Sequence, residues 1–231
     1  MPLCIENLSY SPNNNITLIN NISYTFQKGY IYSIIGKSGS GKTTFLKTLN
    51  NLIPFKGIIK YNNKNILDFY PPLLRTTILY IPQQPILFGN TFEEDVKILA
   101  GFRIFKNKPI KLSYLNDYLK LFNLDKGVLN KNVNDLSGGE KQRLGIIKSL
   151  LIDPEVFLFD EPTAALDMHT EDLFIKLLAT IANNKIIINV SHSISVINKG
   201  HVKLFFNTGK IVKEKNDIIN EEFLKNFLTN G

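Results

Sequence analysis

The chain has 231 residues and a mass of 26.3 kDa, enough to bury a sizeable core in one large domain or two small ones. Its composition, 44% hydrophobic and 20% charged, is that of a folded protein and excludes disorder as the main state. No apolar run approaches the ~20 residues that cross a bilayer, and the N-terminus lacks the pattern of a secretion signal. A single cysteine, Cys4, excludes an internal disulfide framework. These features predict a cytoplasmic globular protein.

The net charge of +7 comes from scattered basic residues. No block of five or six Lys and Arg residues occurs, so the charge is typical of a solvated surface rather than of a nucleic-acid site. A secondary role of this basic surface near acidic lipid headgroups is the alternative. We therefore expect no nucleic-acid partner.

Hydrophobic periodicity predicts strands and helices that alternate along most of the chain. In chain order they are strands at 3–10, 16–26 and 30–35 (with a loop at 11–15), a helix at 45–53, strands and a short helix at 57–81, helices within 91–133 and at 137–151, a strand at 156–159, a helix at 170–182, a strand at 185–190, a hairpin at 205–212 and a helix at 220–228. One face of the 91–133 segment carries Leu112, Leu115, Leu119 and Phe122. The alternation predicts an α/β fold, with a mostly parallel sheet covered on both faces.

The most informative segment lies between the strand at 30–35 and the helix that follows it. It reads Gly36-Lys37-Ser38-Gly39-Ser40-Gly41-Lys42-Thr43-Thr44. Its glycines let backbone N–H groups converge on phosphates, and the helix N-terminus adds a favourable dipole. Lys42 has the length to reach β- and γ-phosphates, and the Thr43 hydroxyl suits Mg²⁺. This pattern predicts a nucleotide-binding loop.

A pair of carboxylates, Asp160 and Glu161, ends the apolar strand at 156–159. Parallel sheets bind ligands at the carboxyl ends of their strands, so both acids are expected beside the phosphate loop. Asp160 suits a Mg²⁺ contact, and Glu161 suits a base that polarises the attacking water.

A second anion-binding helix terminus is predicted at Leu136-Ser137-Gly138-Gly139-Glu140-Lys141-Gln142-Arg143. Ser137 is a helix N-cap by type, and the two glycines leave the first amides bare. With the phosphate loop before it and Asp160-Glu161 after it, this octapeptide resembles the signature motif of ATP-binding-cassette (ABC) ATPases. The resemblance covers nearly the whole chain and implies ATP and Mg²⁺ as cofactors.

The resemblance assigns roles to further residues. Gln83 matches the Q-loop glutamine, which contacts Mg²⁺ and water and reports on a membrane partner; Gln84 is the alternative. Asp167, in Ala164-Ala165-Leu166-Asp167, matches the D-loop residue that communicates across a dimer. His192 matches the switch histidine at the γ-phosphate, whereas His169 and His201 match nothing.

Tyr10 is the predicted aromatic that stacks on adenine. The stretch before Ile16 departs from the family pattern by one residue, which leaves Pro12 near the expected aromatic place. An ordinary strand residue is the alternative reading of Tyr10. Thr43-Thr44 replaces the commoner Ser-Thr and keeps the hydroxyl.

The resemblance also implies an architecture. A single ABC ATPase domain would span 1–231, with an antiparallel β subdomain at about 1–30, a helical signature subdomain at about 90–150, and a P-loop core elsewhere. One chain carries one phosphate loop and one signature, so we expect an ATP-sandwiched homodimer in which Ser137, Gly138 and Gly139 touch the partner's γ-phosphate. A permease would be a separate chain, docked against about 84–95, with this chain peripheral on the cytoplasmic face of the membrane.

Segments 84–91 and 131–136, with the short helical subdomain between them, resemble the ATP-binding subunits of the Fet (YbbL-type) iron-export systems. That resemblance implies a metal-linked cargo. The alternative function is a soluble ABC ATPase, such as a scaffold for iron–sulfur cluster assembly. The apolar Leu87-Phe88 pair favours the permease.

Overall fold

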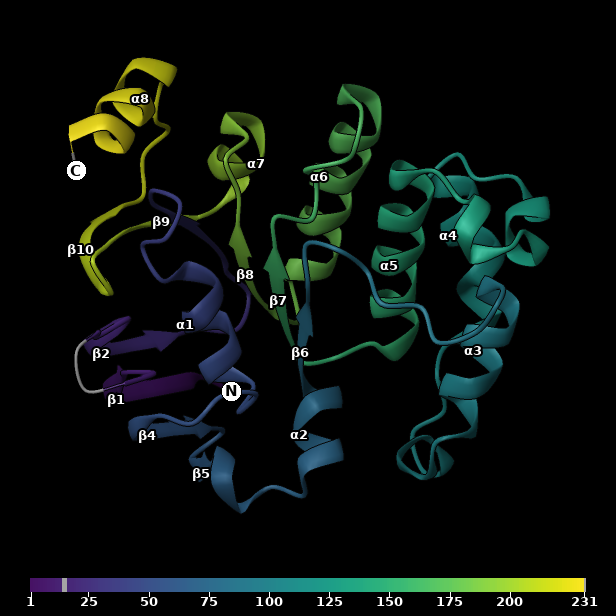
Figure 1. Cartoon of the computed structure of the whole chain (residues 1–231), viewed down its shortest axis with the longest axis horizontal. Helices are drawn as coiled ribbons and strands as arrows, with labels where there is room; N and C mark the ends of the chain where they lie inside the picture. The colour runs from purple at the N-terminus through teal and green to yellow at the C-terminus, as the bar shows by residue number, and fades with distance from the viewer. Residues whose placement is uncertain (14–15, 231) are drawn as a thin grey trace.

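The structure is a computed structural model that describes residues 1–13 and 16–230 (Figure 1). Part of the expected loop at 11–15, namely Asn14 and Asn15, lies outside the described residues. Within the described part of the chain, no helix has the length and apolar character needed to span a membrane.

A six-stranded sheet forms the centre of the molecule, in the order β10-β9-β3-β8-β7-β6. All neighbours are parallel except the hairpin of β9 and β10. The strands are β3 (Ile31–Ile35), β6 (Ile78–Ile81), β7 (Val156–Asp160), β8 (Ile186–Val190), β9 (Val202–Asn207) and β10 (Lys210–Lys215). The predicted parallel sheet is confirmed, and its strands follow the predicted ranges closely.

A second, four-stranded antiparallel sheet lies at the lower left of Figure 1. Its order is β2-β1-β4-β5, with β1 at Leu3–Tyr10, β2 at Ile19–Phe26, β4 at Lys56–Tyr61 and β5 at Lys64–Asn65. The sheet therefore includes residues well beyond the expected 1–30 stretch, because β1 needs β4 on its second edge to pair its backbone.

Eight α-helices are described: α1 (Lys42–Leu49), α2 (Pro71–Thr77), α3 (Phe92–Gly101), α4 (Leu115–Leu121), α5 (Gly138–Ile152), α6 (Met168–Ala182), α7 (Ile194–Lys199) and α8 (Glu221–Asn230). Helices α3, α4 and α5 form the right-hand lobe of Figure 1. Short 3₁₀ turns break the 91–133 segment, and Leu112 falls in one of them. Leu112 is consequently 46% exposed, whereas Leu119 and Phe122 are buried, so the predicted four-residue face was wrong at its first member.

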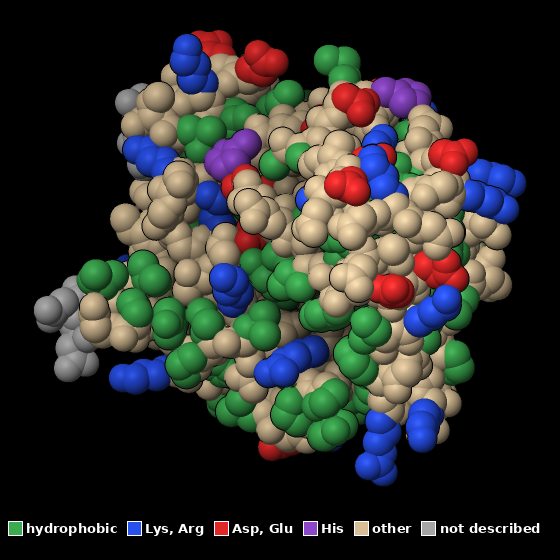
Figure 2. Space-filling view, turned by 45° about the vertical axis from the view of Figure 1, so that its right-hand side comes forward, with side chains coloured by type: hydrophobic (Ala, Val, Ile, Leu, Met, Phe, Trp, Pro, Cys, Tyr) green, Lys and Arg blue, Asp and Glu red, His purple; other side chains and the backbone are tan. Residues whose placement is uncertain are grey.

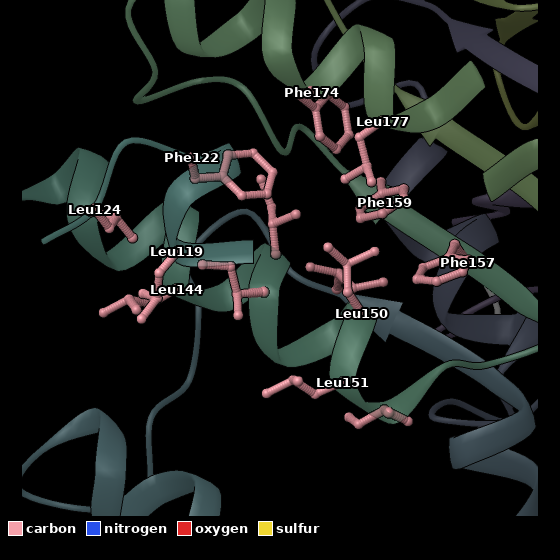
Figure 3. Close-up of a cluster of buried hydrophobic side chains, with 14 of the residues drawn as sticks. Leu119, Phe122, Leu124, Leu144, Leu150, Leu151, Phe157, Phe159, Phe174 and Leu177 are labelled. Atoms are coloured by element: carbon pink, nitrogen blue, oxygen red, sulfur yellow. The ribbon is translucent and has the colours of Figure 1, made fainter. Parts of the chain in front are cut away.

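The two faces of the central sheet bury different partners. Along β7, Val156 and Leu158 pack in the cluster that contains α1 and the antiparallel sheet, whereas Phe157 and Phe159 pack in the cluster of α5 and α6. Figure 3 shows Phe159 beside Phe174 of α6. This alternation explains why every residue of β7 is buried and reads as one continuous apolar run.

The topology brings the predicted site to one edge of the sheet. The phosphate loop follows β3, Gln83 follows β6, Asp160 ends β7, and His192 follows β8. The carboxyl ends of parallel strands therefore gather four separate segments of sequence into one place.

Candidate functional site

The phosphate loop turns sharply before α1, and glycine is required at two of its turns. Gly41 precedes the helix with a φ of +103°, in the left-handed region, and a Cβ on it would lie 2.5 Å from the carbonyl oxygen of Leu18. Gly36 has no room for a Cβ either, because the Phe206 carbonyl abuts it. The loop thereby exposes backbone amides at the start of α1, as a phosphate cradle requires.

The predicted cation of the loop, Lys42, is only 7% exposed. Its Nζ donates to the carbonyl oxygens of Gly36 and Lys37 at 2.7 and 2.8 Å. Burial lowers the pKa of this amine, while Glu161 and Asp160 act in the opposite direction. Lys42 is therefore held over the loop, near both carboxylates.

The other loop side chains differ in exposure. Ser38 is exposed and Thr44 is half-buried, while the Oγ of Ser40 is buried without a hydrogen-bond partner in the described residues. The Nζ of Lys37 donates to the carbonyl oxygen of Thr229 in α8 at 2.9 Å. An unpaired buried hydroxyl inside a cradle of amides fits an oxyanion ligand.

Asp160 is fixed by two hydroxyl groups. Thr43 Oγ1 donates to its Oδ1 at 3.1 Å, and the Tyr80 hydroxyl donates to its Oδ2 at 2.8 Å. The carboxylate is 4% exposed. Burial, with the charge of Asp160, raises the pKa of Tyr80 above its ordinary value, so the phenol keeps its proton and donates.

Sequence reasoning missed Tyr80. It lies on β6 and appears in sequence as an ordinary strand aromatic. Only the parallel register, which places Tyr80 opposite Leu158 on β7, brings its hydroxyl to Asp160.

Glu161 lies between two polar side chains, those of Gln83 and His192. Gln83 Nε2 donates to Glu161 Oε2 at 3.0 Å, and His192 Nε2 lies 3.4 Å from Glu161 Oε1. Glu161 itself has a left-handed backbone, with a φ of +50°, and its N–H donates to Val190. Gln83, rather than its neighbour Gln84, is thus the glutamine that contacts the carboxylate.

The N-terminus of α5 is a complete capping box. Ser137 Oγ accepts the Glu140 N–H at 3.2 Å, and Glu140 Oε2 accepts the Ser137 N–H at 2.7 Å. That backbone N–H, aided by Lys131, holds the pKa of Glu140 below its usual range. The box fixes the helix end but leaves the amides of Gly138 and Gly139 at the surface side of the turn.

This helix end does not meet the phosphate loop of its own chain. Figure 1 shows α1 and α5 on opposite sides of β6, β7 and β8. Gly138 and Gly139 instead face Ala165, whose carbonyl would lie 3.2 Å from a Cβ on Gly139. The two predicted phosphate-binding features are therefore separate within one chain.

Asp167 is the N-cap of α6. Its two carboxylate oxygens accept the N–H and the hydroxyl of Thr170, both at 2.9 Å. These hydrogen bonds, the backbone one first, lower the pKa of Asp167. Within one chain the residue therefore fixes the first turn of α6.

Tyr10 ends β1 and lines a pocket of about 550 Å³ with Thr17, Pro54 and Lys56 among others. Its carbonyl accepts the N–H of Leu18, the residue whose own carbonyl abuts Gly41. The backbone of Tyr10 is thus linked through Leu18 to the phosphate loop. Its role in stacking on adenine stays a prediction, as does the alternative that it is an ordinary strand residue.

A buried ion pair joins α3 to α5, and sequence reasoning missed it. Lys148 Nζ lies 2.9 Å from Asp95 Oδ2, with side chains 12% and 0% exposed. It also donates to the Ile86 carbonyl at 3.1 Å and lies 4.2 Å from the centre of the Phe88 ring. One turn earlier, Gly145 is the only residue type that fits, because a Cβ there would lie 2.6 Å from two Pro85 atoms.

Comparison with known proteins agrees with this geometry. The chain is 35% identical over 166 residues to "Probable iron export ATP-binding protein FetA" of Escherichia coli K12, which covers 71% of this chain and 72% of that protein. It is 36% identical over 213 residues to the energy-coupling factor transporter ATP-binding protein EcfA2 of Mycoplasma genitalium, covering 87% and 69%. It spans only 36% of a longer export ATP-binding/permease protein of Rickettsia typhi, to which it is 30% identical.

Among solved structures, the dimeric bacterial ABC transporter cassette MJ0796 superposes with a TM-score of 0.81 at 27% identity, over 93% of this chain and 98% of that one. A second structure of that cassette, described as a post-hydrolysis state bound to ADP and Pi, gives a TM-score of 0.78 at 26% identity, with the same coverage.

Fold and site together define a P-loop ATPase, in which a cradle of amides, a lysine and a pair of carboxylates meet at the end of a parallel sheet. A family described as ABC transporter matches residues 19–164. The chain belongs to this family, as an ATP-binding subunit.

Proposed function

We propose that two copies of this chain close around two ATP molecules and thereby drive a separate membrane permease. Each ATP would lie between the phosphate loop, Gly36–Thr44, of one copy and Ser137–Gly139 of the other. The observation that carries this proposal is the separation of two anion-binding helix ends on opposite sides of one sheet. Two such ends complete a site only when a second copy supplies the missing one. The similar cassette MJ0796 is dimeric in both of its structures, which supports a dimer here.

The residues of the site suit the cofactors that this function needs. Thr43, Asp160 and Gln83 offer oxygen atoms, which Mg²⁺ prefers, and Mg²⁺ at a nucleotide is usually held by one or two carboxylates together with the phosphates. The described residues contain no cluster of three or more acidic, His or Cys ligands that would hold a metal without a nucleotide. When bound, Mg²⁺ neutralises charge on the transferred phosphate.

The chain's own groups divide the remaining work. Lys42 would leave the loop carbonyls for the phosphate oxygens. Glu161, held from either side, would accept a proton from the attacking water, while Gln83 orients that water and His192 contacts the γ-phosphate. Tyr80 would keep Asp160 in the rotamer that faces Thr43.

The permease would dock in the groove between α2, β6, α3 and α5. This groove encloses about 600 Å³ and includes Pro85, Ile86 and Phe88, within the stretch expected from the sequence. Its Pro85 and Phe88 rest on α5, so a helix seated there would act on both Gln83 and the signature end of α5. The chain would then be peripheral on the cytoplasmic face of the membrane.

The relatives are named for transport, so the soluble scaffold function is not favoured. Export of a metal-linked solute is the finer proposal, because one relative is named for iron export and two segments resemble that group.

The test uses Glu161→Gln, tagged and purified with ATP from solubilised membranes of its own cells. Loss of the base should slow turnover by at least ~10²-fold and trap the ATP-bound dimer on a sizing column. A multi-span membrane protein should co-purify.

The matched variant is Glu161→Gln with Ser137→Arg, whose added side chain blocks the dimer interface without touching the phosphate loop. It should bind ATP and remain a monomer. Dimerisation of this double variant contradicts the head-to-tail arrangement, and wild-type turnover of Glu161→Gln contradicts the assignment of the base. Capture of soluble proteins alone contradicts the permease.

A further inference from the structure

We propose that a cavity at the amino ends of β3 and β9 binds the phosphate group of a small molecule, at a site separate from that of ATP. Lys199, His201 and Lys203 line this cavity, which encloses about 440 Å³. Ile31, the first residue of β3, lines it as well. The phosphate loop follows the other end of this five-residue strand, roughly 16 Å away, so the inference goes beyond the proposed function.

The cavity brings basic side chains together. Figure 2 shows Lys and Arg side chains spread across one face of the molecule, with Asp and Glu side chains among them. In the cavity, Lys199 and Lys203 lie close enough to His201 for their charges to add to the effect of burial in lowering the pKa of its imidazole. No acidic side chain lines the cavity within the part of the chain that the structure describes.

Lys203 is a strand residue with a buried side chain. It is 2% exposed, and burial lowers the pKa of its ammonium group, while the charge of Asp217 acts in the opposite direction. An ammonium group has three donors. Among the described residues, Lys203 Nζ has one acceptor, the carbonyl oxygen of Asn216 at 3.4 Å. A buried ammonium with unused donors is costly until a further acceptor completes its hydrogen bonds.

His201 supplies a second donor. Its Nδ1 accepts the N–H of Ile31 at 2.9 Å, so the neutral ring carries its proton on Nε2. The lowered pKa keeps the ring neutral at pH 7. Tyr30 packs edge-on against it, with 5.6 Å between the ring centres. The imidazole is therefore held in the tautomer that donates from Nε2.

The segment that follows β10 forms one wall of the cavity, through Asn216 and Ile218. Asn198 of α7 fixes this segment at the next residue, Ile219. Its Nδ2 donates to the Ile219 carbonyl at 2.8 Å, and its Oδ1 accepts the Ile219 N–H at 2.9 Å. The wall is thus formed without a ligand, so binding would require little ordering of the chain.

The carboxyl ends of α6 and α7 also reach the cavity, at Ala182 and Lys199. Each helix end carries about half a negative charge, which a lysine in the last turn complements. Lys199 has this structural role in α7. The role does not extend to Lys203, which lies on a strand, and the two helix ends offset only about one of the two lysine charges.

A phosphate ester fits these donors better than a carboxylate does. Its three terminal oxygens match the three groups Lys199, His201 and Lys203, and it carries close to two negative charges at pH 7. Hydrogen bonds between charged partners are roughly twice as strong as neutral ones. The volume of the cavity lies within the range of small-molecule sites, about 300–1,000 Å³, so it has room for the rest of a small ester.

The experiment uses the full chain saturated with Mg²⁺ and a non-hydrolysable ATP analogue, so that the phosphate loop is occupied. Glycerol 3-phosphate and inorganic phosphate are titrated by calorimetry, and glycerate is the carboxylate control. We expect saturable binding of glycerol 3-phosphate and at least ~10-fold weaker binding of glycerate. The chain has three histidines, so NMR of their rings locates the ligand: the His201 signals should shift, and those of His169 and His192 should not.

Lys203→Met and Lys199→Met should each weaken the binding of glycerol 3-phosphate by at least ~10-fold. Lys120→Met is the matched control, because it removes an exposed lysine of α4 outside the cavity. Thermal unfolding verifies the fold of each variant, and the half-buried Lys199 keeps the test available if Lys203→Met does not fold.

Three results would overturn the inference. They are the absence of saturable binding by both phosphate probes, binding that leaves the His201 signals unchanged or is matched by glycerate, and unchanged affinity in both cavity variants. None of them bears on the ATP-driven dimer, which the Glu161→Gln experiment tests separately.

Discussion

At the scale of single residues, the site depends on side chains that hold others in place. Asp160 is buried, and each of its oxygens accepts one hydroxyl hydrogen bond, from Thr43 and Tyr80. Hydrogen bonds to a charged acceptor are roughly twice as strong as neutral ones, so these two hydroxyls set the orientation of the carboxylate.

Tyr80→Phe removes one of these hydrogen bonds and no apolar contact. We expect a loss of about 1–3 kcal/mol in the free energy of unfolding, because a buried carboxylate oxygen loses its donor. Urea denaturation measures it. Tyr114→Phe is the control, since Tyr114 is half-exposed and its hydroxyl forms no hydrogen bond with any residue that the structure describes. Equal stability of the two variants would contradict the role given to Tyr80.

The sequence predicted most of this site, because its residues belong to contiguous motifs at strand ends. The role of Tyr80 could not be predicted, because it depends on the register of β6 against β7, which no local sequence pattern encodes. Asp95 and Lys148 were missed for a related reason: 53 residues separate them, and each appears as a solvated charge on its own helix. For Leu112 the sequence predicted a place on the apolar helical face that the residue does not take, because a 3₁₀ turn interrupts the helical period at this position.

At the scale of elements, α5 connects the signature end to the docking groove. Its N-terminus is fixed by the capping box, and its middle carries Gly145 against Pro85 and Lys148 against Asp95 of α3. The segment after Gln83 is thus packed onto the signature helix and should move with it. In the proposed function, this contact would couple a docked helix to the ATP site.

Lys148→Met should destabilise the protein by about 3–5 kcal/mol, because it leaves the buried carboxylate of Asp95 without its cation, with only the Phe88 N–H as a donor. Lys148→Met combined with Asp95→Leu removes both charges and should recover much of that loss. Guanidinium denaturation of the two variants and the wild type measures the difference. A single variant within about 1 kcal/mol of wild type would show that the pair is not buried in solution.

At the scale of the whole molecule, Asp153 ties the helical lobe to the core. It follows α5, and its two oxygens lie 2.9 Å from Lys111 Nζ and 3.0 Å from Lys185 Nζ. Burial alone would raise the pKa of Asp153, but the hydrogen bonds and charges of the two lysines outweigh it and lower the pKa.

A carboxyl whose pKa is lowered on folding stabilises the native state above its unfolded pKa, about 3.9. That stabilisation is lost as the pH falls through the folded pKa. Asp153→Asn should therefore be less stable than wild type at pH 7, and the gap should narrow as the pH falls towards 3. Asn tolerates the left-handed backbone of this position, a φ of +52°, so the variant tests charge rather than strain. Urea denaturation from pH 7 to 3 measures the gap, and a constant gap would contradict the assignment.

The left-handed backbone of Glu161 places two demands on one position. A non-glycine residue in this region costs of order 1 kcal/mol. The neighbouring strand β8 holds the conformation, because the Glu161 N–H donates to the Val190 carbonyl. Glycine would relieve that cost and at the same time delete the carboxylate. With Glu161 in its proposed role as the base, selection for a stable fold and selection for turnover therefore favour different amino acids at this position. A screen for thermostable variants of this protein would be expected to enrich inactive ones at position 161, so such a screen should include a turnover assay.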